Sequence, residues 1–164
     1  MLVDERADLT YGARYAIDRF VIGVSIGDAA TGFCFGSAAI AGVVNESVGD
    51  FPVVVFADKD TRAVDVFLRT PRRGLNGPED LPETLTIEPV DSPGATGAGE
   101  LADVPEVRDL ETGSTWNIEA GIATAGPLRG TVLQRAPYVS AFYWAWEDFN
   151  PNTVLWGDWF DELN

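Results

Sequence analysis

Short apolar segments separated by turn residues are the feature that most constrains the fold of this chain. The segment from Phe20 to Ile26 (FVIGVSI) is rich in β-branched residues, and a Gly27-Asp28 turn follows it. A second segment, Phe51 to Phe56 (FPVVVF), is continuously apolar, and from Arg62 to Arg69 the residues alternate as in a two-faced strand. These patterns predict β-strands. Further short strands are expected at Val43–Val44, Thr84–Ile87, Thr115–Ile118 and Thr131–Leu133.

Helical patterns are scarce in the sequence. The best one runs from Ser140 to Phe149, with Ser140 as a candidate N-cap and with Trp146 and Phe149 on one face that is expected to join the core. The segment Phe35–Gly42 fits a helix or a tightly packed strand, and its periodicity does not decide between them. We therefore expect a β-rich α+β fold. Its short, mostly antiparallel strands would form a sheet or a partly closed barrel, with one aromatic helix near the C-terminus.

The length and hydropathy of the chain favour one soluble domain. With 164 residues, one domain is the default, and 46% hydrophobic residues are ample for a core. No apolar run is long enough to span a membrane, and the start MLVDERADLT does not resemble a signal peptide. We expect a cytoplasmic protein if Met1 is the natural start, while a fragment or a mature form stays open.

The charge of the chain is strongly negative. There are 26 Asp and Glu against 11 Lys and Arg, which gives a net charge of −15, and Lys59 is the only lysine. Carboxylates in such excess repel one another in dilute buffer. In molar salt the Debye length falls to roughly 3 Å, so this repulsion is screened. The composition favours a halophilic protein, with an acidic surface for a cationic partner as the alternative. Binding to nucleic acid is disfavoured because it needs clustered cations.

Five colinear motifs identify a family. The chain resembles the widespread bacterial and archaeal family called domain of unknown function 3179, in a halophilic archaeal form. The resemblance implies one domain over residues 20–156, preceded by an N-terminal extension (1–19) and followed by an acidic aromatic tail (157–164). The motifs are VIGVSIGDAATGF (21–33), VVNESVGDFPVVV (43–55), DLETGSTWN (109–117), GPLRG (126–130) and FYWAWEDFNPNT (142–153).

The chain departs from the family where reactive groups are expected. Members commonly carry a Cys-Pro-x-Cys-like motif, whose two thiol positions fall on Asp58 and Thr61 here. A Trp-His-Glu motif of the family falls on residues 40–42 (Ile-Ala-Gly), and a Tyr-Pro pair falls on Phe33-Cys34. A carboxylate and a hydroxyl cannot perform thiolate exchange. The resemblance therefore implies a relative without the family's thiol chemistry, and no catalytic residue or cofactor is assigned.

Several polar residues are candidates for a ligand pocket. Asn and Ser side chains commonly satisfy backbone groups at turns, so a structural role is the simpler interpretation. The alternative is that these polar residues line one ligand pocket inherited from an active ancestor. Asp58, Asp60 and Asp65 are also weak candidates for a metal site, against a solvated acidic turn. The candidate pocket residues are Asn45, Asp58, Thr61, Arg62, Ser114 and Trp116.

Aromatic residues near the C-terminus and the single cysteine complete the candidates. An apolar patch with an acidic rim suits docking to a protein partner or to a second copy. Cys34, flanked by Phe33 and Phe35, is expected to be buried and inert. The candidate partner surface comprises Tyr143, Trp144, Trp156, Trp159 and Phe160.

Three functional hypotheses follow from these residues. The first is a non-catalytic scaffold or binding module derived from a thiol-containing family. The second is a redox or metal-dependent enzyme with an altered site, using Cys34 or a bound metal. The third, weaker one is a carbohydrate or small-ligand binding module that uses Trp116 and Trp144.

Overall fold

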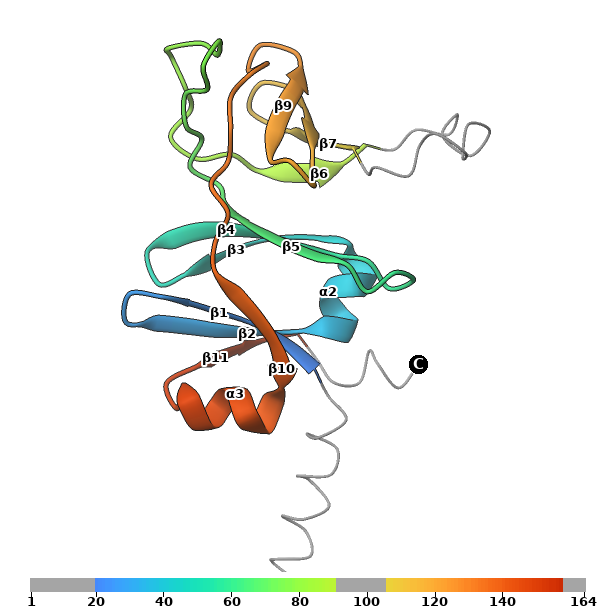
Figure 1. Ribbon diagram of the computed structural model, residues 1–164, viewed down its shortest axis with the longest axis vertical. Coiled ribbons are helices and arrows are strands. Elements are labelled where there is room, and N and C mark those ends of the chain that lie inside the picture. The colour runs from blue at the N-terminus through green and yellow to red at the C-terminus, as the bar shows by residue number, and fades with distance from the viewer. Residues whose placement is uncertain (1–19, 91–105, 158–164) are drawn as a thin grey trace, which may run out of the picture.

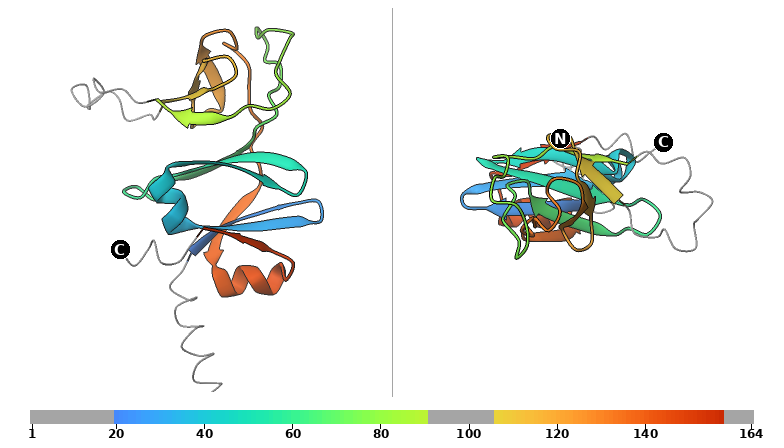
Figure 2. Two further views of the ribbon diagram at one scale, coloured as in Figure 1. Left: turned by 180° about the vertical axis from the view of Figure 1, so that it is seen from behind. Right: turned by 90° about the horizontal axis from the view of Figure 1, so that it is seen from above.

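The protein is built from three stacked β-sheets. The computed structural model describes residues 20–90 and 106–157, and in this part of the chain the strands form three separate, open sheets (Figure 1). The view from behind shows the same layering (Figure 2). The expected β-rich, mostly antiparallel fold is confirmed.

The first sheet combines strands from both ends of the described chain. β1 (Phe20–Ile26) and β2 (Ala29–Cys34) form an antiparallel hairpin through the Gly27-Asp28 turn. β10 (Tyr138–Phe142) pairs antiparallel with the other edge of β1, and β11 (Val154–Trp156) pairs in parallel with β2. The strand order in this sheet is therefore β10-β1-β2-β11.

The second sheet is apolar on both faces because it lies between the other two. It consists of β3 (Val43–Val48), β4 (Phe51–Ala57) and β5 (Val64–Leu68), all antiparallel. Along β4 the side chains alternate between two cores, so that Val53 and Val55 face the first sheet and Val54 faces the third. This position explains why FPVVVF is continuously apolar.

The third sheet is antiparallel and packs on the second through a separate core. In this core Trp116, Leu85 and Leu128 pack against Val54 and Phe67. The segment that follows the sheet runs back along β5, where Arg135 bridges to Phe67, before it enters β10. The strands are β6 (Ile87–Pro89), β7 (Glu106–Asp109), β8 (Thr115–Asn117) and β9 (Ile122–Ala125).

Two helices complete the described structure. The segment Phe35–Gly42, for which the sequence did not decide between helix and strand, forms helix α2 (Phe35–Ala41). This helix follows β2 directly and buries small side chains against the core between the first and second sheets. Helix α3 (Tyr143–Phe149) covers the outer face of the first sheet, as Figure 1 shows. Only Trp146 of α3 is fully buried, and its ring fills the hollow above Gly23 and Gly32.

Several details of the sequence prediction are wrong. Ser140 does not cap the C-terminal helix, because it lies in β10 and pairs with Ile22, and the helix begins three residues later without a side-chain cap. Phe149 does not join the core: its side chain is 86% exposed, since the hollow in the sheet holds the Trp146 ring alone. Val132, in the expected strand Thr131–Leu133, makes only isolated bridges.

The predicted N-terminal extension and nearly all of the predicted tail lie outside the described residues. Among the residues that are described, no helix is long and apolar enough to cross a membrane. The predicted domain boundaries stay a prediction.

Candidate functional site

A cleft of about 420 Å³ lies between the second and third sheets, at the end of β4. Its apolar wall contains Phe56, Val107 and Ile118, which are buried side chains of the core between these sheets. We call it the Asp58 cleft. Its carboxylates come from both sheets: Asp58, Asp65, Glu106 and Glu119.

The turn that follows β4 is closed by its own side chains. One carboxylate oxygen of Asp58 accepts hydrogen bonds from the backbone N–H groups of Asp60 (2.7 Å) and Thr61 (3.1 Å). The Thr61 hydroxyl accepts one from the N–H of Ala63 (3.2 Å). The N–H groups of Thr61 and Asp60 hold the pKa of the Asp58 carboxyl below its usual range, because they favour the charged form. Asp58 is therefore an anion at neutral pH and a poor general acid.

The three aspartates proposed as weak metal candidates do not converge. Asp58 is used by the turn, and Asp65 accepts a hydrogen bond from Arg135 at 2.8 Å. Asp60 is exposed. Within residues 20–90 and 106–157, no group of three His, Cys, Asp or Glu side chains is placed to hold a metal ion.

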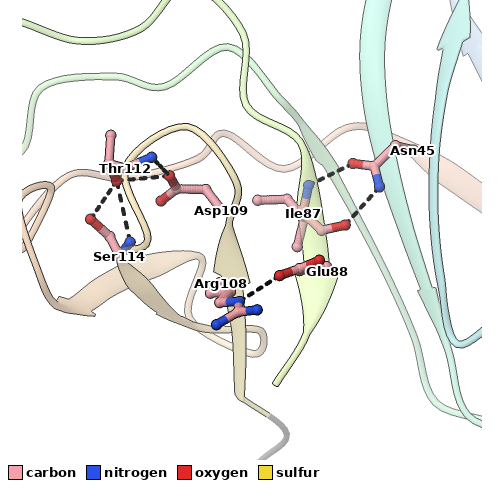
Figure 3. A network of polar contacts seen from close by, with 7 residues as sticks. All are labelled: Asn45, Ile87, Glu88, Arg108, Asp109, Thr112 and Ser114. Atoms are coloured by element: carbon pink, nitrogen blue, oxygen red, sulfur yellow. Dashed lines mark hydrogen bonds and ion pairs between the residues drawn. The ribbon is translucent and has the colours of Figure 1, made fainter. Parts of the chain in front are cut away.

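Asn45 joins the second sheet to the third. Its side-chain amide donates to the carbonyl of Ile87 (2.7 Å) and accepts from the N–H of the same residue (2.9 Å). Figure 3 shows this pair of bonds between β3 and β6. Asn45 thereby satisfies the free edge of β6 as a neighbouring strand would, and this is a structural role.

Ser114 and Trp116 belong to a buried polar network around Asp109. Figure 3 shows the part of this network that Asp109, Thr112 and Ser114 form. The Asp109 carboxylate accepts hydrogen bonds from the Trp116 indole N–H (2.8 Å) and from the N–H and hydroxyl of Thr112 (2.6 and 2.7 Å). The Ser114 hydroxyl accepts from the N–H of Leu128 at 2.8 Å. Trp116 is buried, its N–H is bonded, and it is not among the residues that line the cleft with Asp58.

The remaining candidates are dispersed over the molecule. Arg62 lines a different pocket from its neighbour Thr61. Trp144 is 47% exposed, whereas Trp156 is half-buried against Phe33, with ring centroids 5.8 Å apart. Tyr143 is half-buried and donates to Glu147. Trp159 and Phe160 lie outside the described residues.

The comparison with known families matches most of the chain. A family model described as "Protein of unknown function (DUF3179)" covers residues 7–153. The chain belongs to this family. No curated protein and no solved structure matches it significantly. Membership in the DUF3179 family therefore establishes kinship and carries no activity with it.

The resemblance to DUF3179 motifs makes the Asp58 cleft the leading candidate for a functional site. From the sequence we expected the family's two thiol positions at Asp58 and Thr61 and the glutamate position of Trp-His-Glu at Gly42, and these three residues line the cleft. Cys34 is buried elsewhere, beside β1. Sequence reasoning missed Glu106 and Glu119, because only the stacking of two sheets brings them to the cleft.

Proposed function

We propose that this protein is a halophilic, non-catalytic member of its family that serves as a binding module, with residues 20–156 acting as one domain. The observation that supports the proposal is the set of bonds made by Asp58 and Thr61, the residues at which the resemblance implies the family's thiols. Asp58 and Thr61 supply oxygen atoms that close their own turn, and a carboxylate or a hydroxyl cannot perform thiolate exchange.

The Asp58 cleft is the proposed binding site. Its buried aromatic and aliphatic wall suits an apolar body. Asp65 is paired with Arg135, and the other three carboxylates, of Asp58, Glu106 and Glu119, suit a positive charge. The proposed ligand class is therefore a small molecule or a protein segment that carries a cationic group on an apolar or aromatic body.

Benzamidine is a simple probe of this class. NMR titration in molar KCl is expected to shift amide signals around the cleft. Glu119→Gln is expected to weaken binding by about two- to threefold, the modest effect of one screened, exposed charge. Glu83→Gln, which removes an exposed charge outside the cleft, is the matched control. Shifts that cluster elsewhere, or no shifts at all, would refute the proposed site.

The alternative enzyme hypotheses require an accessible thiol or a bound metal. We expect the buried Cys34 to react with a chromogenic disulfide only after denaturation. We also expect purified protein to contain no stoichiometric metal. A thiol that reacts rapidly in the folded state, or one metal ion per chain, would favour the redox or metal-dependent enzyme instead.

The outer face of α3 supports a second proposal, self-association. Trp144 and Phe149 of this helix expose 47% and 86% of their surface, and apolar patches on a protein surface mark sites of protein–protein contact. We expect sedimentation velocity in molar KCl to reveal a dimer that Phe149→Ser dissociates. A monomer at all concentrations would rule this interface out.

A further inference from the structure

A second pocket, of about 230 Å³, lies beside the start of α2, and no described residue lines both this pocket and the Asp58 cleft. We call it the Arg62 pocket. An apolar cavity of about 150 Å³ is enough to bind benzene, so this pocket has room for an aromatic ring with a small polar group. The described residues that line it come from β1, from α2, from the turn before β5 and from β10: Phe20, Val21, Phe35, Arg62 and Ser140.

Arg62 brings an unpaired positive charge to this pocket. Its guanidinium carbon lies 5.9 Å from the centre of the Phe35 ring, and this cation–π contact uses none of the guanidinium N–H groups. Among residues 20–90 and 106–157, no carboxylate forms an ion pair with Arg62 and no acceptor takes a hydrogen bond from its side chain. The planar set of N–H donors is therefore available to a carboxylate, which such a set binds through two parallel hydrogen bonds.

The backbone of Arg62 indicates that the turn alone does not require an arginine. Its φ of 62° lies in the left-handed region, and no other described residue except glycine has a positive φ. Glycine and asparagine adopt this conformation more readily than arginine. The backbone N–H of Arg62 donates to the carbonyl of Asp58 at 2.8 Å, and any residue except proline would supply that donor. The closure of the turn therefore does not explain the guanidinium.

The rest of the lining favours an anion that carries an aromatic body. Phe20 and Phe35 supply two rings, and Ser140 supplies a hydroxyl group. In molar salt, the condition proposed for this protein, the Debye length is about 3 Å, so an ion pair at an exposed arginine is weak by itself. Contact between apolar surfaces is not screened by salt. A simple inorganic anion would therefore bind poorly, whereas a carboxylate on a ring would gain from both contacts.

We propose that the Arg62 pocket binds a small aromatic carboxylate, with the carboxylate on the guanidinium of Arg62 and the ring against Phe35. The charge of this ligand is opposite to that of the ligand proposed for the Asp58 cleft. The carboxylates of the Asp58 cleft would repel it, so each site excludes the ligand of the other. The two proposals therefore stand or fall separately.

Benzoate is a simple probe of this class. NMR titration of the full-length protein in molar KCl is expected to give saturable shifts of the amide signals of Val21, Phe35 and Arg62. Benzamide keeps the ring and lacks the charge, whereas acetate keeps the charge and lacks the ring. Each is expected to bind about five- to tenfold more weakly than benzoate, because each makes only one of the two contacts.

Arg62→Asn removes the guanidinium and spares the turn, because asparagine tolerates a positive φ and keeps the backbone N–H. It is expected to weaken benzoate binding by about five- to tenfold and to leave benzamide binding unchanged. Arg129→Asn, which changes another exposed arginine, in the turn after β9, is the matched control and should leave benzoate binding unchanged. Unchanged amide signals away from the pocket confirm that each variant is folded.

Three results would overturn the proposal. The first is that benzoate shifts are absent or lie outside the Arg62 pocket. The second is that benzamide binds as tightly as benzoate. The third is that Arg62→Asn and Arg129→Asn weaken benzoate binding equally, which would mean that benzoate responds only to the total charge. Benzamidine reports on the Asp58 cleft and benzoate on the Arg62 pocket, so failure of one proposal is distinguished from failure of the other.

Discussion

Arg69 holds three segments together through backbone carbonyls. Its guanidinium donates to the carbonyls of Val53 (2.7 Å), Leu85 (3.0 Å) and Glu46 (2.9 Å). A lysine cannot reproduce this planar set of donors. We expect Arg69→Lys to lower the free energy of unfolding by about 2 kcal/mol, because half-buried carbonyls lose their partners.

Urea unfolding in molar KCl measures this effect. The control is Arg73→Lys. In the described part of the chain Arg73 makes an exposed ion pair with Glu79 at 3.5 Å, and its loss is expected to cost less than about 0.5 kcal/mol. Equal effects of the two substitutions would contradict the structural role of Arg69.

Tyr143 gives a pH-dependent signal of its own. Its hydrogen bond to Glu147 raises the pKa of the phenol from 10.0 to about 12. The folded state thus favours the neutral phenol, so this contribution to stability is complete below pH 10 and is lost as the pH rises from 10 to 12. Ultraviolet titration should show one late phenol that disappears in Tyr143→Phe. Glu147→Gln should move the transition towards pH 10; an unchanged transition would exclude this hydrogen bond as the cause.

At the scale of elements, α3 is fixed to the first sheet by one side chain. A Cβ added at Gly23 would clash with the Trp146 indole, and one added at Gly32 would lie 3.2 Å from it. Gly23→Ala is expected to destabilise the protein by about 2 kcal/mol, because the added methyl group and the indole would overlap unless one of them shifts.

Thermal unfolding of a double variant distinguishes this clash from a local effect on β1. Combining Gly23→Ala with Trp146→Leu removes the clashing ring. The two changes should therefore cost less together than the sum of their separate effects. Simple additivity would mean that the glycine matters for another reason.

The sequence predicted those strands whose apolar pattern is strong. β1 and β4 were placed almost to the residue, since β-branched runs bounded by turns leave little choice. β2 (AATGFC) was missed because it is built from small residues, and its Gly32 makes room for a tryptophan more than 100 positions away. The start of α3 was misplaced because Ser140 also suits a strand, and only pairing with Ile22 decides between the two.

The part of the Asp58 cleft that lies on the second sheet could be predicted from the sequence. The turn at Asp58 and Thr61 was located from the order of motifs along the chain. The carboxylates of Glu106 and Glu119 could not be, because they reach the Asp58 cleft from the third sheet. Nor does any local pattern show that Trp116 is buried and bonded to Asp109.

At the scale of the whole molecule, we expect the net charge of −15 to make stability depend on salt. Screening shortens the Debye length from about 10 Å in 0.1 M salt to about 3 Å in 1 M salt, which relieves the mutual repulsion of surface carboxylates. We expect the melting temperature, measured by circular dichroism, to rise steeply between these KCl concentrations.

A partly neutralised variant provides the control for this salt effect. Asp50→Asn, Asp80→Asn and Glu83→Gln change exposed residues and together alter the net charge from −15 to −12. This variant should depend less steeply on KCl than the wild type. A melting temperature that is flat in both proteins would contradict the halophilic interpretation.

The first sheet takes two strands from residues 20–34 and two from residues 138–156, while the second and third sheets each come from a contiguous stretch. During synthesis on the ribosome, the N-terminal hairpin must therefore wait for more than 100 residues before its remaining partners emerge. The second and third sheets can assemble as soon as their own residues have emerged. The first sheet, which contains the first strands of the chain, is completed last. Such long-range closure is slow, so folding of the whole protein is expected to be limited by this final step.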